Sequence, residues 1–557
     1  VQDYAPRPPA QAPVADETPI EDGPAAGTDE ELPALAGAPE PAAPATPGLD
    51  TDEAAPGLAR PASDVIRVRT DVLDLQIDRQ GGTLRRAVLL RYPVTKDHPD
   101  TLIALLESSR DNLGLIQTGL RAAGDAPEPN HLAEFSAGGD RYELGEAERL
   151  VVPLTWTDGA GLTVRKDLVF TRGSYRIDVR QTVINDSDTD WRGAAYARIL
   201  RRSFDPERSM FDVDTYSFSG PVIYDGERSE KLDRDDLLSD GPLTLAAAGG
   251  WVASIQHHFL SAVVPPPDAS YRYSVTVRDH VASASTIGPT EIVAAGAEHE
   301  FETILFVGPK LQAQLEKISP RLKLTVDYGW LTIIAQPLFW LLSKVHAFVG
   351  NWGVSIILVT VLIKLAFYKL TQTSGRSMAK MREIQPRMKA LQERYKDDRQ
   401  QLSQAMMELY KREKVNPAAG CLPILIQMPF FLAFYWVLLE SVEMRQAPFA
   451  LWISDLSTRD PYFILPLIMG AAMYFQQKLN PAPADPVQAK VMQIMPIVFT
   501  GFFAFFPSGL VLYWVTNTVL SIAQQWQINR VVHAEAQAAK GGRKKRSKAD
   551  ANDDSAG

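Results

Sequence analysis

The stretch GNWGVSIILVTVLIKLAFYKLT, from Gly350 to Thr371, sets the class of the fold, because it is long and apolar enough to cross a bilayer. Lys364 nevertheless lies well inside it, between Ile363 and Leu365. At a rise of about 1.5 Å per residue, Lys364 is roughly 18 Å beyond Trp352, past the middle of a helical span. A charge near the middle of a span costs on the order of 2.5 to 3.5 kcal/mol on insertion scales. The presence of a lysine at this position therefore calls for an explanation.

Two interpretations of Lys364 follow from its position. The side chain either snorkels to the nearer interface or faces water inside the protein. Thr360 and Tyr368, one turn to either side, place further polar groups on the same helix face. Two later apolar segments add polar residues that can line the same space: Gln427 in one, and Tyr513, Thr516, Asn517, Ser521 and Gln524 in the other. This polar face favours a hydrophilic groove, and snorkelling stays the alternative.

Five segments of the second half have the composition of membrane spans. They cover about 352–370, 421–439, 462–475 with its flanks, 491–506 and 510–528. Arg and Lys concentrate in the loop after the first span and in the tail KGGRKKRSK. Because four spans separate these basic segments, both fall on one side, which the positive-inside rule makes the cytoplasm. The first half of the chain then lies in the periplasm of a bacterial inner membrane.

The first half differs in composition from the second. The chain has 557 residues, 45% of them hydrophobic, and a formal net charge of -10, with the acidic excess mostly before residue 300. Its only cysteine is Cys421, so no intrachain disulfide is possible. Residues 1–60 are rich in Ala, Pro and acidic side chains and poor in large apolar ones, so we expect a disordered linker there.

Residues 61–310 show short β-type segments separated by Asp-Gly, Gly-Gly and Asn-Asp turns. Ile66 and Val68 alternate with polar neighbours, and Tyr271, Tyr273, Val275 and Val277 repeat at every second position, as in strands with one buried face. This pattern predicts a β-sandwich of more than 200 residues. His257 and His258 would face opposite sides of a strand there, which favours a structural role over a shared ligand site.

Two further segments are expected to be amphipathic helices. Residues 325–350 are apolar on one broad face, which predicts a helix in the membrane interface, with a further span as the alternative. Residues 374–415 place Met378, Met381, Met388 and Leu391 at helical spacing, and a second such run follows KDDR. The two runs predict an antiparallel helical hairpin, whose methionines either pack on each other or adapt to varied client segments.

Several classes of enzyme are excluded by missing motifs. The sequence has no GxxxxGK[ST] loop, no HExxH pair and no GxSxG elbow, so we expect neither an enzyme nor a nucleotide-driven machine. Two other classes remain as alternatives. One is a channel or transporter, although the internal repeats typical of transporters are not found. The other is a membrane-tethered carbohydrate-binding protein whose function lies in the β-domain.

Several motifs together closely resemble the YidC insertases of Gram-negative bacteria, members of the YidC/Oxa/Alb family. They are LTVDYGWL, GNWGVSIILVT, SMAKMREIQPRMKALQERY, KVNPAAGCLPILIQMPFFLAFYWVL, VEMRQAPFALWISDLSTRDPYFILPLIMG and FPSGLVLYWVTN. The resemblance implies a membrane insertase and chaperone that works alone or with the Sec translocon, without cofactor or metal. It implies a five-helix core (351–371 and 417–530), a cytoplasmic helical hairpin, a periplasmic super-β-sandwich and a disordered basic cytoplasmic tail (531–557). The family also has an N-terminal membrane anchor, for which these residues offer no segment.

The resemblance also assigns roles to particular residues. Its hydrophilic groove, open to cytoplasm and lipid, holds a positive residue of the first core span, and Lys364 aligns with that residue, where the Gram-negative pattern has arginine. Client segments would leave along a hydrophobic slide on the second and fourth core spans. The expected slide residues are Phe430, Phe431 and Phe434 on one span and Phe499, Phe502, Phe503 and Phe506 on the other. Ordinary lipid-facing surface is the alternative for these phenylalanines. The implied partners are nascent membrane proteins, the Sec translocon, the lipid bilayer and the ribosome, the last through the basic tail and loops.

Overall fold

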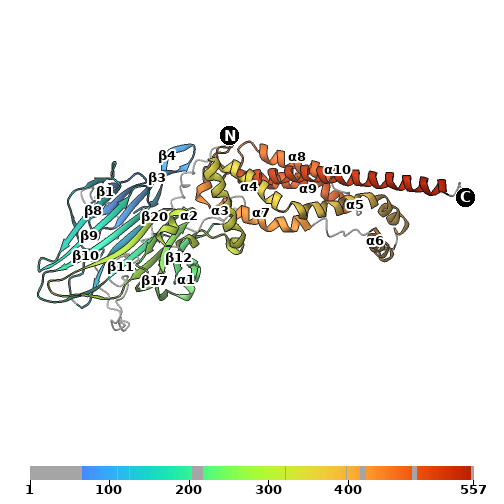
Figure 1. Cartoon of the computed structure of the whole chain (residues 1–557). Coiled ribbons are helices and arrows are strands. Elements are labelled where there is room, and N and C mark those ends of the chain that lie inside the picture. Colours follow the sequence, from blue (N-terminus) through green and yellow to red (C-terminus); the bar gives the residue numbers. More distant parts are fainter. Residues whose placement is uncertain are drawn as a thin grey trace, which may run out of the picture.

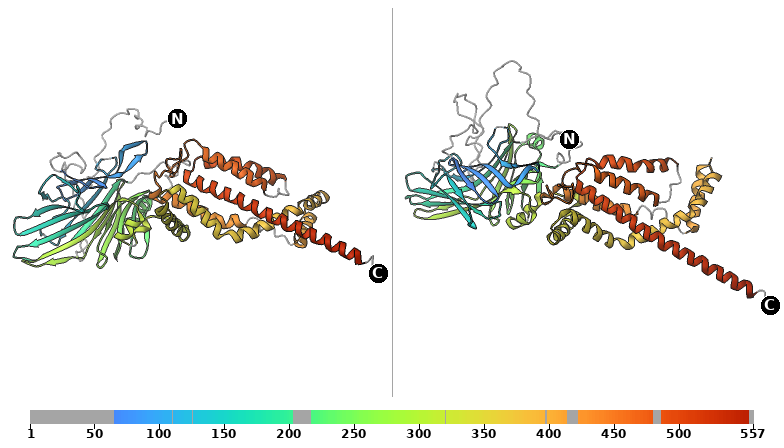
Figure 2. Two further views of the ribbon diagram at one scale, coloured as in Figure 1. Left: turned by 45° about the horizontal axis from the view of Figure 1, so that its top comes forward. Right: turned by 90° about the horizontal axis from the view of Figure 1, so that it is seen from above.

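The computed structural model describes residues 65–109, 111–124, 126–202, 217–319, 321–396, 398–413, 422–479 and 486–553. The molecule is elongated, with a β-sandwich at one end and the helices of the second half at the other (Figure 1). Two further views show the longest helix running beside the other helices and beyond them to the C-terminal end (Figure 2). The expected linker at residues 1–60 and Cys421 lie outside the described residues.

One sheet of the sandwich has 11 strands among the described residues, in the order β14-β17-β18-β11-β5-β3-β2-β1-β7, with β4 on β3 and β19 on β11. Apart from the parallel pair β1–β7, its neighbours run antiparallel. The strands are β1 (Val65–Arg69), β2 (Leu73–Asp78), β3 (Leu84–Thr95), β4 (His98–Leu106), β5 (Gly114–Ala122), β7 (Arg141–Glu143), β11 (Trp191–Arg202), β14 (Leu243–Ala248), β17 (Ser270–Arg278), β18 (Val281–Ile287) and β19 (Glu291–Val293).

The second sheet has nine strands among the described residues, in the order β13-β12-β15-β16-β20-β10-β9-β8-β6. They are β6 (Ser136–Ala137), β8 (Arg149–Thr157), β9 (Leu162–Thr171), β10 (Arg176–Asn185), β12 (Ser219–Tyr224), β13 (Ser229–Lys231), β15 (Trp251–Gln256), β16 (Phe259–Val264) and β20 (Glu298–Pro309). The last strand, β20, leads the chain from the sandwich into the helices, so the second sheet supplies the connection between the two parts.

The expected alternation of side chains is confirmed where it was clearest. In β1, Ile66 and Val68 are fully buried between more exposed neighbours, and in β17 Tyr271, Tyr273 and Val275 point into the core. The expectation that His257 and His258 face opposite sides of a strand was wrong. They form the tight turn between β15 and β16, where His257 has a φ of 44°, and their rings stack with centroids 3.7 Å apart. A turn does not alternate its side chains as a strand does, so both rings lie on one side.

The helices follow the sandwich, apart from α1 (Arg234–Asp240), which lies within it. The longer helices are α2 (Gln312–Ile318), α3 (Thr332–Val349), α4 (Trp352–Ala366), α5 (Tyr368–Arg394), α6 (Arg399–Glu413), α7 (Leu422–Glu440), α8 (Ile464–Leu479), α9 (Pro486–Phe503) and α10 (Ser508–Asp553). Short 3₁₀ turns are η4 (Leu322–Thr325), η5 (Gly329–Leu331) and η7 (Val442–Met444). Because α10 continues to Asp553, the expected disordered tail at 531–557 is helical for most of its length, as its run of Ala, Glu, Gln and Lys favours.

Only part of the expected membrane architecture is visible in helix length and hydropathy. Among the described residues, Gly329–Val349 alone is a single helix long and apolar enough to span a membrane. The pair α4 and α5 passes the same test together, with a bend of 67° at Phe367, and Leu425–Glu440 and Lys490–Phe503 are shorter apolar helices. The first apolar stretch therefore ends as a helix at Ala366, and Tyr368–Thr371 belong to α5.

Two helices of the expected hairpin contact each other. Ile384 and Met388 of α5 are buried, and Met381, Met406, Leu409 and Tyr410 pack around them. The expected methionine face is thus used, at least in part, to join α5 to α6.

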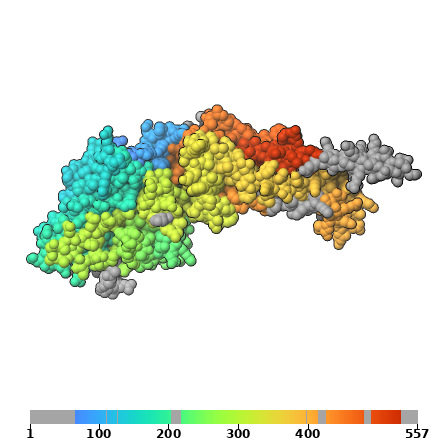
Figure 3. Space-filling view, viewed as in Figure 1, coloured from blue at the N-terminus to red at the C-terminus, as the bar shows by residue number. Residues whose placement is uncertain are grey.

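The sandwich and the helices share one apolar core. A single cluster of buried side chains runs from the sandwich through Val307, Leu315 and Leu331 to Val437 in the last turn of α7 and Val442 in η7. In the space-filling view the two parts accordingly form one continuous surface (Figure 3). This continuity fixes how the sandwich is placed on the helical core.

Candidate functional site

Lys364 lies in the last turn of α4 and is buried, with 8% of its surface exposed. Its ammonium donates a 2.7 Å hydrogen bond to Ser521 Oγ on α10, and the Ser521 hydroxyl donates at 2.7 Å to the carbonyl oxygen of Asn517. Within the described part of the chain, no carboxylate lies at ion-pair distance from this ammonium. An ammonium has three donors, so burial with one neutral partner is unfavourable unless water reaches the other two.

The other expected groove residues contribute in different ways. Thr360 and Thr516 donate their hydroxyls to the carbonyl oxygens of Ile356 and Leu512, at 2.6 and 2.8 Å, and so bond within their own helices. Gln427 is half-buried on α7, and no hydrogen bond among the described residues joins it to Lys364. Gln524, three positions after Ser521, is 9% exposed, and its Nε2 has no protein partner in the described structure.

Tyr513, the remaining expected groove residue, belongs to the aromatic packing of the core. It is buried, and its ring stacks on Phe434 of α7 with centroids 4.4 Å apart and planes inclined by 17°. The polar part of the site therefore consists of Lys364, Asn517, Ser521 and Gln524, and it lies between α4 and α10.

Apart from Phe430, the expected slide residues form a packed aromatic cluster between α7, α9 and α10. Phe431 lies 4.7 Å from Trp514 and 6.3 Å from Phe503, measured between ring centroids. Phe499, Phe502 and Phe506 each lie within 6.0 Å of Phe503, and Phe430 packs against Phe367 at 5.3 Å. The sequence reasoning missed Trp514, which lies at the centre of this cluster, because a tryptophan in an apolar run carries no signal of its position.

The burial of these phenylalanines separates two roles. Phe434 and Phe503 are 0% and 2% exposed and hold the helices together, whereas Phe502 is 54% exposed. Aliphatic side chains beside them are also exposed, with Leu425 on α7 at 63% and Ile497 on α9 at 74%. The outward apolar surface of α7 and α9 is therefore aliphatic as well as aromatic.

The loop between α7 and α8, residues 441–463, closes the end of the core that faces the sandwich. Asp460, 1% exposed, accepts hydrogen bonds from the backbone N–H of Leu465 at 2.7 Å and from Trp452 Nε1 at 3.0 Å. Phe449 packs on the first turn of α4 so closely that a side chain at Gly353 would collide with its ring. The backbone N–H of Ser508, at the start of α10, donates a hydrogen bond to the carbonyl oxygen of Thr458 in this loop.

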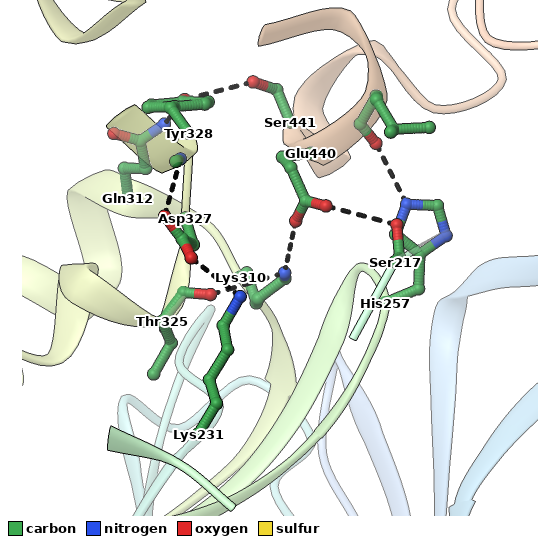
Figure 4. Close-up of polar contacts among 12 residues, drawn as sticks. Ser217, Lys231, His257, Lys310, Gln312, Thr325, Asp327, Tyr328, Glu440 and Ser441 are labelled. Carbon is green, nitrogen blue, oxygen red and sulfur yellow. Dashed lines mark hydrogen bonds and ion pairs between the residues drawn. The ribbon is translucent and has the colours of Figure 1, made fainter. Parts of the chain in front are cut away.

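A second polar cluster, absent from the sequence-based expectations, lies where the sandwich meets α7 (Figure 4). We call it the polar joint; its side chains are Ser217, Lys231, His257, Lys310, Gln312, Thr325, Asp327, Tyr328, Glu440 and Ser441. At its centre Lys310 Nζ lies 3.0 Å from Glu440 Oε2, with side chains 2% and 8% exposed. Burial lowers the pKa of Lys310, and the carboxylate of Glu440 partly opposes this shift.

Contacts from several segments surround this ion pair. Ser217 Oγ donates to Glu440 Oε1 at 3.1 Å, and the His257 ring nitrogen Nε2 lies 3.0 Å from the carbonyl oxygen of Leu439. The Tyr328 hydroxyl lies 3.3 Å from Ser441 Oγ and accepts from Gln312 at 2.6 Å. A possible signal was the acidic Glu440 at the end of the apolar run FFLAFYWVLLE, but its partner lies 130 residues earlier.

The sequence is similar to known proteins over most of its length. Residues 65–341 match the family described as "YidC periplasmic domain", and residues 344–536 match "60Kd inner membrane protein". The chain is 50% identical over 471 residues to a membrane protein insertase YidC from Methylococcus capsulatus, covering 84% of this chain and 86% of the relative. It is 51% identical over 486 residues to a membrane protein insertase YidC from Alkalilimnicola ehrlichii, covering 86% and 85%. A crystal structure of an active YidC insertase aligns with 83% of this chain and 92% of that chain, at 19% identity and a TM-score of 0.37.

Proposed function

The chain belongs to the YidC family of membrane protein insertases, and on this premise we propose that clients enter through a hydrophilic groove at Lys364 and leave along α7 and α9. The insertase function and the inner-membrane location with a periplasmic domain follow from the family. The residues that carry out insertion are the subject of the proposal. It keeps Lys364, Thr360, Gln427, Thr516, Asn517, Ser521 and Gln524 as the groove set, and Tyr513 supports the groove from the aromatic core beside it.

The observation that carries the proposal is the isolated charge of Lys364. Its ammonium is buried against Ser521 of α10 without a carboxylate partner in the described structure, and the amide nitrogen of Gln524 nearby in sequence also lacks a protein partner. Buried polar groups without protein partners are normally hydrated. A water-filled space between α4 and α10 accounts for both side chains, whereas a lysine that snorkels would hold its ammonium outside the helices.

The proposed mechanism lowers the cost of moving a polar tail across the bilayer. A client's hydrophilic tail enters the groove, which shortens its path through hydrocarbon, and an acidic tail is attracted by Lys364. The membrane potential then contributes about 2.3 kcal/mol per charge per 100 mV. Burial of the client's apolar segment in lipid contributes about 0.8 kcal/mol per CH₂, so release needs no bound nucleotide.

The slide is proposed on the outward surface of α7 and α9. Phe502, Leu425 and Ile497 are exposed there and offer the client an apolar surface. The buried Phe434 and Phe503 support this surface from behind, together with Phe431, Phe499 and Phe506. Phe430, the remaining residue of the proposed slide, packs against Phe367.

The topology is part of the same proposal. Five spans place the α5–α6 hairpin and the C-terminus in the cytoplasm and the sandwich in the periplasm, and the distribution of Arg and Lys supports this arrangement. Helix α3 lies in the interface, because Trp330, Ile333, Trp340 and Phe348 along and beside it are all more than half exposed while Ala335 and Leu342 are fully buried. The Sec translocon and the ribosome are the proposed partners besides clients and lipid.

A comparison of lysine variants tests the groove. In proteoliposomes, Lys364→Ala should slow the insertion of clients with acidic translocated tails roughly tenfold, equivalent to about 1.4 kcal/mol. Lys364→Arg should stay within about twofold, since arginine keeps the charge. Lys369→Ala is the matched control, because Lys369 is exposed on the next helix and should not matter.

A chemical probe tests the water. In a Cys421→Ser chain, the variant Lys364→Cys should react with a membrane-impermeant thiol reagent added from the cytoplasmic side. Equal insertion rates for all three lysine variants, or a thiol at position 364 that is sealed from the reagent, would exclude the groove as proposed.

A further inference from the structure

The outer end of α7 needs something to fix its position, because the helix itself is apolar on all sides. From Leu425 to Leu439 its only polar side chains are those of Gln427, Tyr435 and Trp436, and Pro429 interrupts its backbone hydrogen bonding. A helix without a polar face has no polar side chains to fix its rotation and depth, and apolar packing alone would have to set both. The first charged side chain after this run, Glu440, is therefore well placed to set both.

Glu440 connects α7 to two separate segments. Its Oε2 pairs with Lys310, the residue directly after β20, and its Oε1 accepts from Ser217, which precedes β12. Lys310 also lies 3.5 Å from the carbonyl oxygen of Thr325 in η4 (Figure 4). Both carboxylate oxygens are thus used, and both have directional partners outside the helix.

The residues on either side of Glu440 are held in the same way. The Leu439 carbonyl oxygen has His257 as its partner, and Ser441 has Tyr328. Val437 and Ala433, one and two turns before Glu440 on the same face, are fully buried. The polar end and the buried face therefore specify one setting of α7.

We infer that the Lys310–Glu440 pair is a positioning element of insertion, which holds the outer end of α7 on the segment between β20 and α3 and so sets the α7 surface that clients meet. Neither residue touches the client. The inference rests on the proposed slide, and it assigns a function to the polar joint that the groove and the slide do not require. A buried pair is suited to this role because its two charges tolerate few alternative arrangements, whereas apolar contacts tolerate many.

The first test removes the carboxylate. In proteoliposomes containing the full chain, Glu440→Gln should insert a single-span client with an acidic tail roughly tenfold more slowly, since it leaves the Lys310 ammonium buried without its partner. The matched control is Glu316→Gln, which breaks the exposed Lys323–Glu316 pair (2.9 Å, side chains 37% and 60% exposed) and should change the rate by less than about twofold.

The second test separates positioning from loss of folded protein. A photoreactive residue is placed at Leu425 on α7 or at Ile497 on α9, and cross-linking to the client is measured for each. A misplaced α7 should lower the ratio of the 425 to the 497 cross-link about fivefold in Glu440→Gln, whereas loss of folded protein lowers both cross-links and leaves the ratio unchanged.

The third test replaces the ion pair with a covalent bridge. In a Cys421→Ser chain, Lys310→Cys with Glu440→Cys should insert slowly when reduced, and a short bis-methanethiosulfonate linker between the two thiols should restore the rate. An unchanged cross-link ratio in Glu440→Gln, a wild-type rate in that variant, or a linked protein as slow as the reduced one would each overturn the inference. Absence of client cross-links from both positions in the otherwise unchanged chain would instead refute the proposed slide.

Discussion

Lys166 in the sandwich is a buried cation of a different kind from Lys364. It is fully buried in β9, its ammonium donates to the carbonyl oxygens of Gly81 and Thr118 at 2.7 Å each, and it lies 4.9 Å from the centre of the Phe135 ring. Burial lowers the pKa of Lys166 to about 7. Carbonyl oxygens satisfy two of its donors and leave the charge without a carboxylate, so this side chain ties three segments together at an electrostatic cost.

That cost predicts a pH dependence of the sandwich. The unfolded chain keeps the ordinary pKa of about 10.5, so between pH 7 and 10.5 it binds more protons than the folded chain, and stability rises with pH. Lys166 raises the free energy of unfolding by at most about 1.4 kcal/mol for each pH unit in this range. Below pH 7 both states carry the proton, so the free energy of unfolding no longer changes with pH through this group. Pulse proteolysis of the sandwich in urea, in the detergent-solubilised full chain, should show its midpoint rising from pH 7 to pH 9.

Lys166→Met provides the control for this prediction. Methionine fills a similar volume without a titrating group, so the variant should lose most of the rise with pH. A rise that is equally steep in Lys166→Met would assign the pH dependence to other groups.

Among the elements, the loop at residues 441–463 depends most visibly on a single side chain. Asp460 supports the start of α8 through Leu465 and holds Trp452 in place, and these contacts connect the loop to a helix it precedes. Asp460→Ala leaves the Leu465 N–H and the Trp452 indole N–H without their acceptor in a buried place. We expect a loss of about 2 kcal/mol in local stability.

The loss should be local and measurable as protease access. Cleavage within residues 441–463 from the periplasmic side should become faster in Asp460→Ala, whereas cleavage in the sandwich should keep its rate. Asp455→Ala is an informative companion, since Asp455 bonds within the loop, to Gln446 and Ser457, rather than to α8. Unchanged cleavage in Asp460→Ala would show that the apolar contacts of Phe449 alone hold the loop.

The elements also show which parts of the structure could be predicted from sequence. Alternation in Val65–Arg69 and apolar runs such as 421–439 identify strands and helices because the signal lies within each segment. The bend at Phe367 and the turn at His257 have no such local signal. Lys364 stood out because a charge interrupts an apolar run, but Lys310 and Glu440 are ordinary charges at segment ends, and only the tertiary fold brings them together.

At the scale of the whole molecule, the sandwich and the helical core share an apolar interface. The residues of the polar joint come partly from the sandwich and partly from the segments that follow it. Lys310, Thr325 and Tyr328 follow β20, whereas Ser217, Lys231 and His257 belong to the sandwich. A chain that lacks residues 65–309 therefore keeps the Lys310–Glu440 pair and loses the side chains that shield it from water.

This division predicts the behaviour of the shortened chain. It should still insert a small single-span client, because the groove and the slide lie in the helices. In this background Glu440→Gln should change the rate by less than about fivefold, since a hydrated ion pair contributes only about 0 to 1 kcal/mol. The measurement is the insertion rate in proteoliposomes for both chains, with and without the substitution. A tenfold effect of Glu440→Gln in the shortened chain would show that the sandwich does not shield the pair.

The place of Lys310, one residue beyond β20, has a consequence for chimaeras between relatives. Lys310 and Glu440 are 130 residues apart in sequence, yet neither charge can be changed alone without leaving the other buried and unmatched. If a sandwich from a relative is grafted together with that relative's residue at position 310, this residue would face Glu440 of the recipient chain, with which it did not evolve as a pair. A boundary at Pro309 keeps both charges in the recipient, so it is there that sandwiches should be exchangeable.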